Sequence, residues 1–461
     1  MRPLRRILLA CLALALSLAA GRAAAQDVPL LLSDKLEMHR LQNVGAAWQT
    51  VPIANALSAP VVTCTYVLTS NASNEAHVRL RNVGAGRFDL RVQRFENSSA
   101  ITASDVYCLV AETGAHTLPD GRAFEAGTVL STVTNGHAAG WTAGQSERID
   151  TLMSTTFANP VVLGSVMSFN DPNASVFWTW DGANRRNPPT GSAIWVGKHI
   201  GMINGTRSAE TLGYIVFEQG SGAVNGLNYT VQKGPVSIAG TGNAPPYSYS
   251  VSGDLDMAVA MQAGENGGNG SWAVLYGADP LPPGSIQLAV EEETVAGDMS
   301  RTHINEEVFY IGVENAAQAA AFDIDKSVAA HPDSDTPFQI PGSDVTYTLS
   351  VRNTGTGVPD RDSLFMHDAL PAEVAFVNGD ANGSALPGTD PVVVTLGADS
   401  GLSVAGIGYR NAASAPTGFG DCTDGPGPAV RHVCVALDGY ARPGALYADT
   451  EVEIAFRARI R

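Results

Sequence analysis

The chain has 461 residues, of which 44% are hydrophobic and only 16% are charged. Lysines and arginines number 28 against 45 aspartates and glutamates, which gives a formal net charge of −17 and argues against a nucleic-acid partner, because nucleic-acid binding requires a basic face. The length predicts three or four domains. The many glycines (48) and prolines (26) are typical of turn-rich all-β proteins.

The N-terminus has the pattern of a secretory signal peptide. Arg2, Arg5 and Arg6 precede an apolar run at residues 7–20, which is too short to span a bilayer. Three alanines at residues 23–25 predict cleavage before Gln26, so residues 1–25 are expected to be removed. Cys11 ends a sequence that mimics a lipoprotein cleavage box, but hardly any apolar segment precedes it. No later segment reaches the length of a transmembrane helix, so the protein is predicted to be secreted or held at the cell surface without a transmembrane anchor.

An eight-residue apolar pattern that ends in glutamate occurs three times, at residues 105–112, 211–218 and 307–314. Each copy is rich in β-branched and aromatic residues, which predicts a buried strand. The copies lie about a hundred residues apart, which is the size of one small β domain.

Two further blocks repeat in the same order. The first passes from an apolar strand through a polar turn and aligns without gaps at residues 64–79, 163–178 and 257–272. The second is a short strand at residues 88–92, 192–196 and 286–290. The sequence therefore predicts three repeats at residues 26–131, 132–236 and 237–320.

The first repeat resembles an H-type lectin domain, and more specifically the lectin-like repeats of large bacterial surface proteins. The resemblance rests on Trp48, Pro-Val-Val at 60–62, Val-Arg-Leu-Arg-Asn-Val at 78–83, Phe-x-Leu-x-Val at 88–92 and the acid-terminated strand. It implies a six- or seven-stranded antiparallel sandwich. H-type lectins bind sugars such as N-acetylgalactosamine at subunit junctions, but the resemblance places no sugar-contacting residue on this chain.

Residues 321–461 have a different pattern. Alternating strands at 323–328 and 345–351 flank a Pro-Gly turn, and another strand closes the segment at 452–460. This run is similar to the bacterial surface module catalogued as "domain of unknown function eleven", which implies an immunoglobulin-like sandwich that serves as a spacer. The predicted fold class is therefore all-β, with three lectin-like sandwiches followed by one immunoglobulin-like sandwich.

Removal of the signal peptide leaves four cysteines, an even number that favours disulfides in an exported protein. Of the three possible connectivities, we expect Cys64–Cys108 and Cys422–Cys434, because each pair lies inside one predicted domain. In the second repeat, the positions expected to match Cys64 and Cys108 are Leu163 and Tyr214. In the third repeat, they are Met257 and Tyr310. Buried free thiols are the alternative.

Tryptophans are the best candidates for ligand contacts. Three arginines of the first repeat, Arg79, Arg81 and Arg91, align with three tryptophans of the second, Trp178, Trp180 and Trp195. The third repeat keeps Trp272. Arginines rarely point into a core, so the sequence predicts that these tryptophans face outward. Such a patch could pack against an adjacent repeat, stack on sugar rings, or reflect a mistaken register.

Catalytic and metal-binding motifs are missing from the sequence. The nine histidines show no metal-ligand spacing, and neither a nucleophile elbow nor a phosphate-binding loop occurs. His303, near Glu306 and Glu307, could belong to an acid–base cluster, but we expect it at the start of a surface strand. We expect residues 291–293 (three glutamates) at a solvated strand end, and Glu265 in a flexible turn with too few oxygens for calcium. No metal and no cofactor are predicted.

The sequence therefore predicts a non-enzymatic exported protein for adhesion or carbohydrate binding. Its expected partners are glycans or other surface proteins, and it could form oligomers. The alternatives are a purely structural surface or matrix scaffold without a ligand, and an enzyme whose site the sequence does not reveal.

Overall fold

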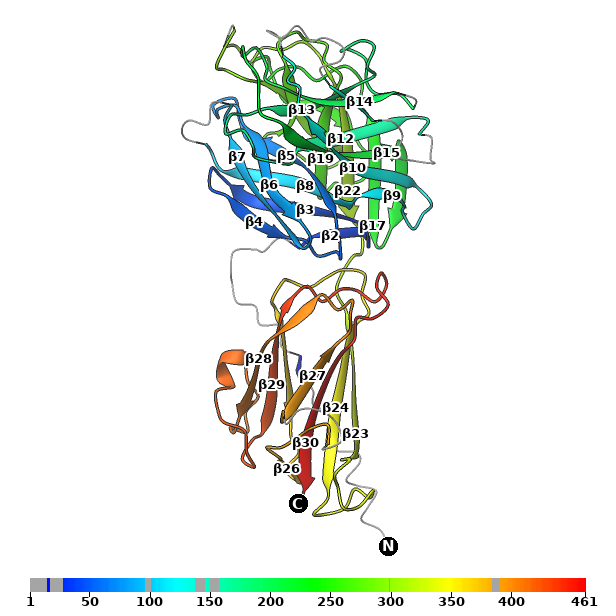
Figure 1. Ribbon diagram of the computed structural model, residues 1–461, viewed down its shortest axis with the longest axis vertical. Coiled ribbons are helices and arrows are strands. Elements are labelled where there is room, and N and C mark those ends of the chain that lie inside the picture. Colours follow the sequence, from blue (N-terminus) through cyan, green and yellow to red (C-terminus); the bar gives the residue numbers. More distant parts are fainter. Residues whose placement is uncertain are drawn as a thin grey trace. The chain divides into compact units, whose positions relative to one another are not determined.

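The computed structural model describes residues 15–16, 28–95, 101–136, 146–149, 157–191, 193–297, 299–383 and 390–461. The chain forms two compact units, the first of which spans Pro29–Gln318, while the second contains Ala319–Arg461 (Figure 1). The described residues form strands and one short 3-10 helix, η2 (Phe419–Asp421), so the predicted all-β fold is confirmed. None of their helices is long and apolar enough to cross a membrane.

Three four-stranded antiparallel sets of strands in the first unit share one topology. The first set runs in the order β2 (Leu30–Ser33), β3 (Leu36–Val44), β8 (Ser104–Glu112) and β5 (Pro60–Leu68). The second is β9 (Gly114–Thr117), β10 (Ala123–Ser131), β15 (Glu210–Glu218) and β12 (Pro160–Val166). The third is β16 (Gly220–Val224), β17 (Leu227–Lys233), β22 (Glu307–Asn315) and β19 (Met257–Ala263).

Each four-stranded set has a three-stranded counterpart. These are β4 (Gln49–Pro52), β7 (Arg87–Gln93) and β6 (His77–Gly84), then β11 (Glu147–Ile149), β14 (Ile194–His199) and β13 (Val176–Trp180), then β18 (Tyr247–Ser250), β21 (Ser285–Glu292) and β20 (Ser271–Tyr276). A short parallel pairing of β20 with β5 joins the third repeat to the first.

The acid-terminated strands β8, β15 and β22 occupy the same third place in their sets and are buried, as predicted. The gapless alignment of their partner strands is wrong, however. Tyr214 lies opposite Gly164 rather than Leu163, and Tyr310 lies opposite Ala260 rather than Met257. A side chain at Gly164 would collide with the ring of Phe177, so glycine is required opposite Tyr214.

The second and third repeats complete their sheets with strands from the segment predicted to belong to the preceding repeat. The segment expected to close the first repeat at residue 131 contains β10, which pairs with β15 of the second repeat. In the same way β17 pairs with β22 of the third. The edge strands β5, β12 and β19 also meet, since the Cys64 amide donates to Ser165 Oγ at 3.2 Å and the Ala260 amide donates to Thr65 Oγ1 at 2.8 Å. One hydrophobic core therefore serves all three repeats.

The second unit is a two-sheet structure with its own core. One sheet contains β23 (Phe322–Ala330), β24 (Asp344–Asn353), β30 (Val452–Ile460) and β26 (Val374–Phe376), with β27 (Val392–Leu396) also on β30. The other contains β25 (Leu364–Ala369), β29 (His432–Gly439) and β28 (Leu402–Arg410), and β1 (Ala15–Leu16) pairs with β25. Alternating burial along β24 places Tyr347 and Leu349 in the core and explains the period of two in the sequence.

Both predicted disulfides are present. Cys64–Cys108 joins β5 to β8 where the two residues lie directly opposite each other. Cys422–Cys434 joins the residue after η2 to β29.

Candidate functional site

The tryptophans proposed as ligand contacts are not an exposed patch. Trp178 and Trp180 are each 2% exposed and Trp272 is 6% exposed, while Trp195 is half-buried, so side chains predicted to face outward are covered by other parts of the protein. The rings of Trp178 and Trp180 stack with centroids 5.1 Å apart. Trp272 stacks on Phe95 of the first repeat and donates from Nε1 to a main-chain oxygen of that repeat. Packing against an adjacent repeat is therefore confirmed for Trp272.

Arg79, which aligns with Trp178, is also fully buried, at an interface between repeats and not in the core of its own sandwich. Its Nη2 donates to the main-chain oxygen of Asp171 at 2.8 Å and lies 3.7 Å from Glu210 Oε1. Its guanidinium also lies 4.5 Å from the ring centroid of Phe169. The repeats bury the outer faces of their small sheets against one another, so an arginine on such a face becomes an interface residue.

An arginine closes each of the three repeat junctions. Arg79 extends from the first repeat to the second, as described above. Arg185 extends from the second repeat to the third and donates to the main-chain oxygen of Asn266 at 3.0 Å. Arg301 extends from the third repeat back to the first and donates to the main-chain oxygen of Ser73 at 2.8 Å. The repeats therefore form a closed ring within one chain.

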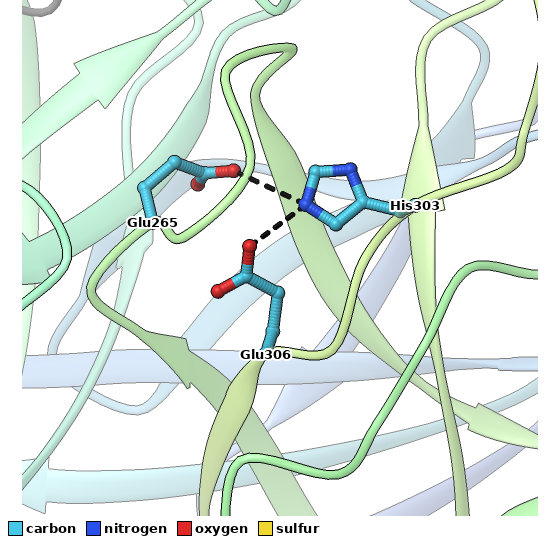
Figure 2. A group of neighbouring side chains, drawn as sticks. All are labelled: Glu265, His303 and Glu306. Carbon is cyan, nitrogen blue, oxygen red and sulfur yellow. Dashed lines mark hydrogen bonds and ion pairs between the residues drawn. The ribbon is translucent and has the colours of Figure 1, made fainter.

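A buried polar cluster lies in the third repeat, where the sequence predicts only surface groups. Glu265 and Glu306 have no exposed area, and Glu292 and His303 are at most 4% exposed. The expectations of a solvated strand end for Glu292 and of a surface strand for His303 are therefore wrong, and Glu265 is buried within its turn. The loop after β21 folds back over the turn after β19, so that groups far apart in sequence come together (Figure 2).

His303 is the centre of the cluster. Its Nε2 lies 2.8 Å from Glu306 Oε1 and 3.7 Å from Glu265 Oε1, as Figure 2 shows. Its Nδ1 contacts Glu292 Oε1 on the opposite side of the ring. Ser271 Oγ lies 3.2 Å from His303 Nε2 and 2.8 Å from Glu265 Oε1. The ligand atoms of Glu265, His303 and Glu306 all lie within 4.8 Å of one another.

The electrostatics of this cluster follow from burial and from opposed charges. Burial by itself lowers the pKa of His303, but its contacts with Glu292 and Glu306 and the charge of Glu265 outweigh burial and raise that pKa to about 10. Burial, reinforced by the charge of Glu306, raises the pKa of Glu265. Burial therefore favours the neutral form of Glu265, whereas the neighbouring acidic groups favour the protonated form of His303.

Main-chain amides of a turn hold the carboxylate of Glu306 in place. The amides of Asn266 and Gly267 donate to its carboxylate at 2.8 and 2.7 Å. Glu210, at the start of β15, accepts from the amides of Asn170 and Asp171 at 3.0 Å in the second repeat. The two glutamates cap equivalent turns, but no local sequence pattern reveals this equivalence, because each capping residue and its turn lie about forty positions apart.

An open polar pocket of about 240 Å³ lies where the third repeat meets the first. The first repeat contributes Arg40, Asp105 and Tyr107, and the third contributes Asp256 and Asp279. Arg40 Nη2 lies 2.9 Å from Asp105 Oδ2. Burial raises the pKa of Tyr107 to about 12, with additional contributions from the three aspartates. No local sequence pattern indicates this pocket, because segments from two repeats form it.

No protein-family model matches the chain. Over 365 residues, or 76% of its length, the chain is 26% identical to halomucin of Haloquadratum walsbyi (strain DSM 16790 / HBSQ001). The match covers 4% of halomucin, so the chain spans only a small part of that protein. This similarity and the two disulfides are consistent with an extracellular or surface protein.

Proposed function

We propose that the chain is a non-enzymatic surface-interaction protein that binds carbohydrate in the pocket between its third and first repeats. The observation that carries the proposal is the set of polar side chains around that pocket, in which Arg40 and Tyr107 face the aspartates of both repeats. Sugar hydroxyls both donate and accept hydrogen bonds, so adjacent carboxylates and a guanidinium suit them.

The arrangement of the repeats supports the lectin-like interpretation. H-type lectins bind sugars at subunit junctions, and in this chain three repeats form their junctions within one polypeptide. The pocket lies at one such junction. The similarity to halomucin supports a surface location, and the second unit would then act as an immunoglobulin-like spacer.

A glycan array probed with the mature full-length chain tests this proposal. We expect binding that weakens at least tenfold in Asp279→Asn and in Arg40→Ala, since each variant removes a polar group from the pocket. Asp323→Asn removes the same charge from an exposed position on β23 and should bind as the parent does.

The alternative is a scaffold without a ligand, which the burial of the tryptophans at and near repeat interfaces favours. An array without any bound glycan would support that alternative. Binding that survives both pocket variants would move the carbohydrate site elsewhere and contradict the proposed pocket.

A further inference from the structure

We propose that Glu265, His303 and Glu306 form a buried site for one divalent transition-metal ion, with zinc as the best match. The proposal does not depend on carbohydrate binding. Glu292 contacts the same histidine, so three acidic side chains and one imidazole meet here. All four side chains are almost completely shielded from solvent. The acidic side chains of the cluster outnumber the one basic side chain that forms ion pairs with them.

The second repeat supplies an internal comparison. Its Glu210 caps the turn that corresponds to the one capped by Glu306, but Arg79 lies 3.7 Å from Glu210 and balances its charge. In the third repeat Arg185 approaches the corresponding turn, yet its guanidinium donates to main-chain oxygens. Among the residues that the structure describes, the three carboxylates form ion pairs with His303 alone.

The geometry of the histidine matches a metal ligand. Glu292 engages Nδ1, which leaves Nε2 directed at Glu265 and Glu306, and metal-binding histidines are commonly oriented by such a carboxylate. The two distances from Nε2, 2.8 and 3.7 Å, bracket the separation of about 3.3 Å that ligands of a tetrahedral zinc ion require.

The donor set selects the class of metal. One imidazole nitrogen and two carboxylates, with the Ser271 hydroxyl next to both Glu265 and His303, form a mixed nitrogen and oxygen site without thiolate. Zinc accepts these ligands in a four-coordinate geometry, whereas calcium requires six to eight oxygens. The ion would tie the loop that carries His303 to the turn that carries Glu265, so its role would be structural.

Metal analysis of the full chain tests the site. The protein is unfolded in chelator, refolded with zinc, freed of excess metal, and measured for bound zinc per chain and for thermal stability. We expect one zinc per chain and a higher Tm than in the chelated sample. Glu265→Gln and His303→Gln should each weaken zinc binding at least tenfold while the protein still folds around a neutral side chain of similar size.

Glu210→Gln is the matched control, since it removes a turn-capping carboxylate of the second repeat and should leave the zinc content unchanged. Parallel samples contain manganese, calcium or magnesium. The proposal is overturned if the refolded parent binds no more zinc than the His303→Gln variant, or if calcium binds more tightly than zinc.

Discussion

Arg79 Nη2 lies 3.7 Å from Glu210 Oε1, and neither side chain is exposed to solvent. This ion pair joins the first repeat to the second. It has no counterpart in the sequence pattern, since the two residues belong to different repeats and to strands that are not paired. A buried pair of this kind makes each partner dependent on the other.

Substitution of Arg79 by leucine should lower the free energy of unfolding by about 3–5 kcal/mol, because Glu210 would remain buried without a cation. The double variant Arg79→Leu/Glu210→Gln should recover part of that loss. Urea denaturation of the parent, both single variants and the double variant measures the coupling. An additive result would show that the pair does not contribute to stability.

Trp272→Ala should destabilise the protein by about 3–5 kcal/mol, because its indole fills an interface between the third and first repeats. Leu130→Ala is the control, as Leu130 is 58% exposed and its loss should change stability by less than about 0.5 kcal/mol. Thermal denaturation compares the two. Equal Tm values for both variants would argue that Trp272 is not an interface residue.

His77 should make the protein sensitive to acid. Burial and the charges of Arg79 and Arg91, with a smaller contribution from His199, hold the pKa of His77 well below its ordinary value of 6.5. The unfolded chain therefore binds a proton below about pH 6.5 that the folded chain excludes, so stability falls as the pH drops, by up to about 1.4 kcal/mol per pH unit.

His77→Phe should reduce this loss between pH 6.5 and 4.5, since phenylalanine cannot be protonated and an adjacent cavity of about 50 Å³ can receive the larger ring. Urea denaturation at several pH values measures the slope. A slope that matches that of the parent would assign the acid sensitivity to other groups.

Asp344 should stabilise the second unit at neutral pH. Burial raises its pKa, but hydrogen bonds from Arg459 and Arg457 outweigh burial and hold the pKa below 3.8. Its contribution is therefore complete above the pKa of the unfolded chain and is lost as the pH falls through the lower pKa of the folded state. Asp344→Asn should lower stability by about 1–3 kcal/mol at pH 7 and much less near pH 3. A deficit independent of pH would contradict this explanation.

The two disulfides should differ in their effects. Cys64–Cys108 closes a segment of 44 residues and Cys422–Cys434 one of 12, so loop-closure entropy predicts contributions of about 4 and about 3 kcal/mol. Two variants, each with both cysteines of one disulfide replaced by alanine, test which disulfide contributes more to the free energy of unfolding, measured by denaturation. A larger loss from the second pair would mean that packing around the cysteines outweighs the entropy of the unfolded chain.

Local sequence patterns were sufficient for the strands. Alternation along β24 and the apolar runs of β8, β15 and β22 reflect the environment of each strand, so they predicted burial correctly. The cysteine pairs were also predictable, because each joins segments within one predicted domain. The burial of Trp178 was not predictable, because a residue on the outer face of a sheet can still be covered by the next repeat.

The sequence by itself determined the all-β class, the threefold repetition and the cysteine pairing, since these depend on periodicity and spacing along the chain. Only the tertiary structure decided that β10 completes the sheet of the next repeat, that Arg79 is buried, and that His303 meets Glu265 and Glu306. Pairing across repeats depends on which faces meet in space. Charged residues carry no periodic signal that distinguishes a solvated strand end from the inside of a junction.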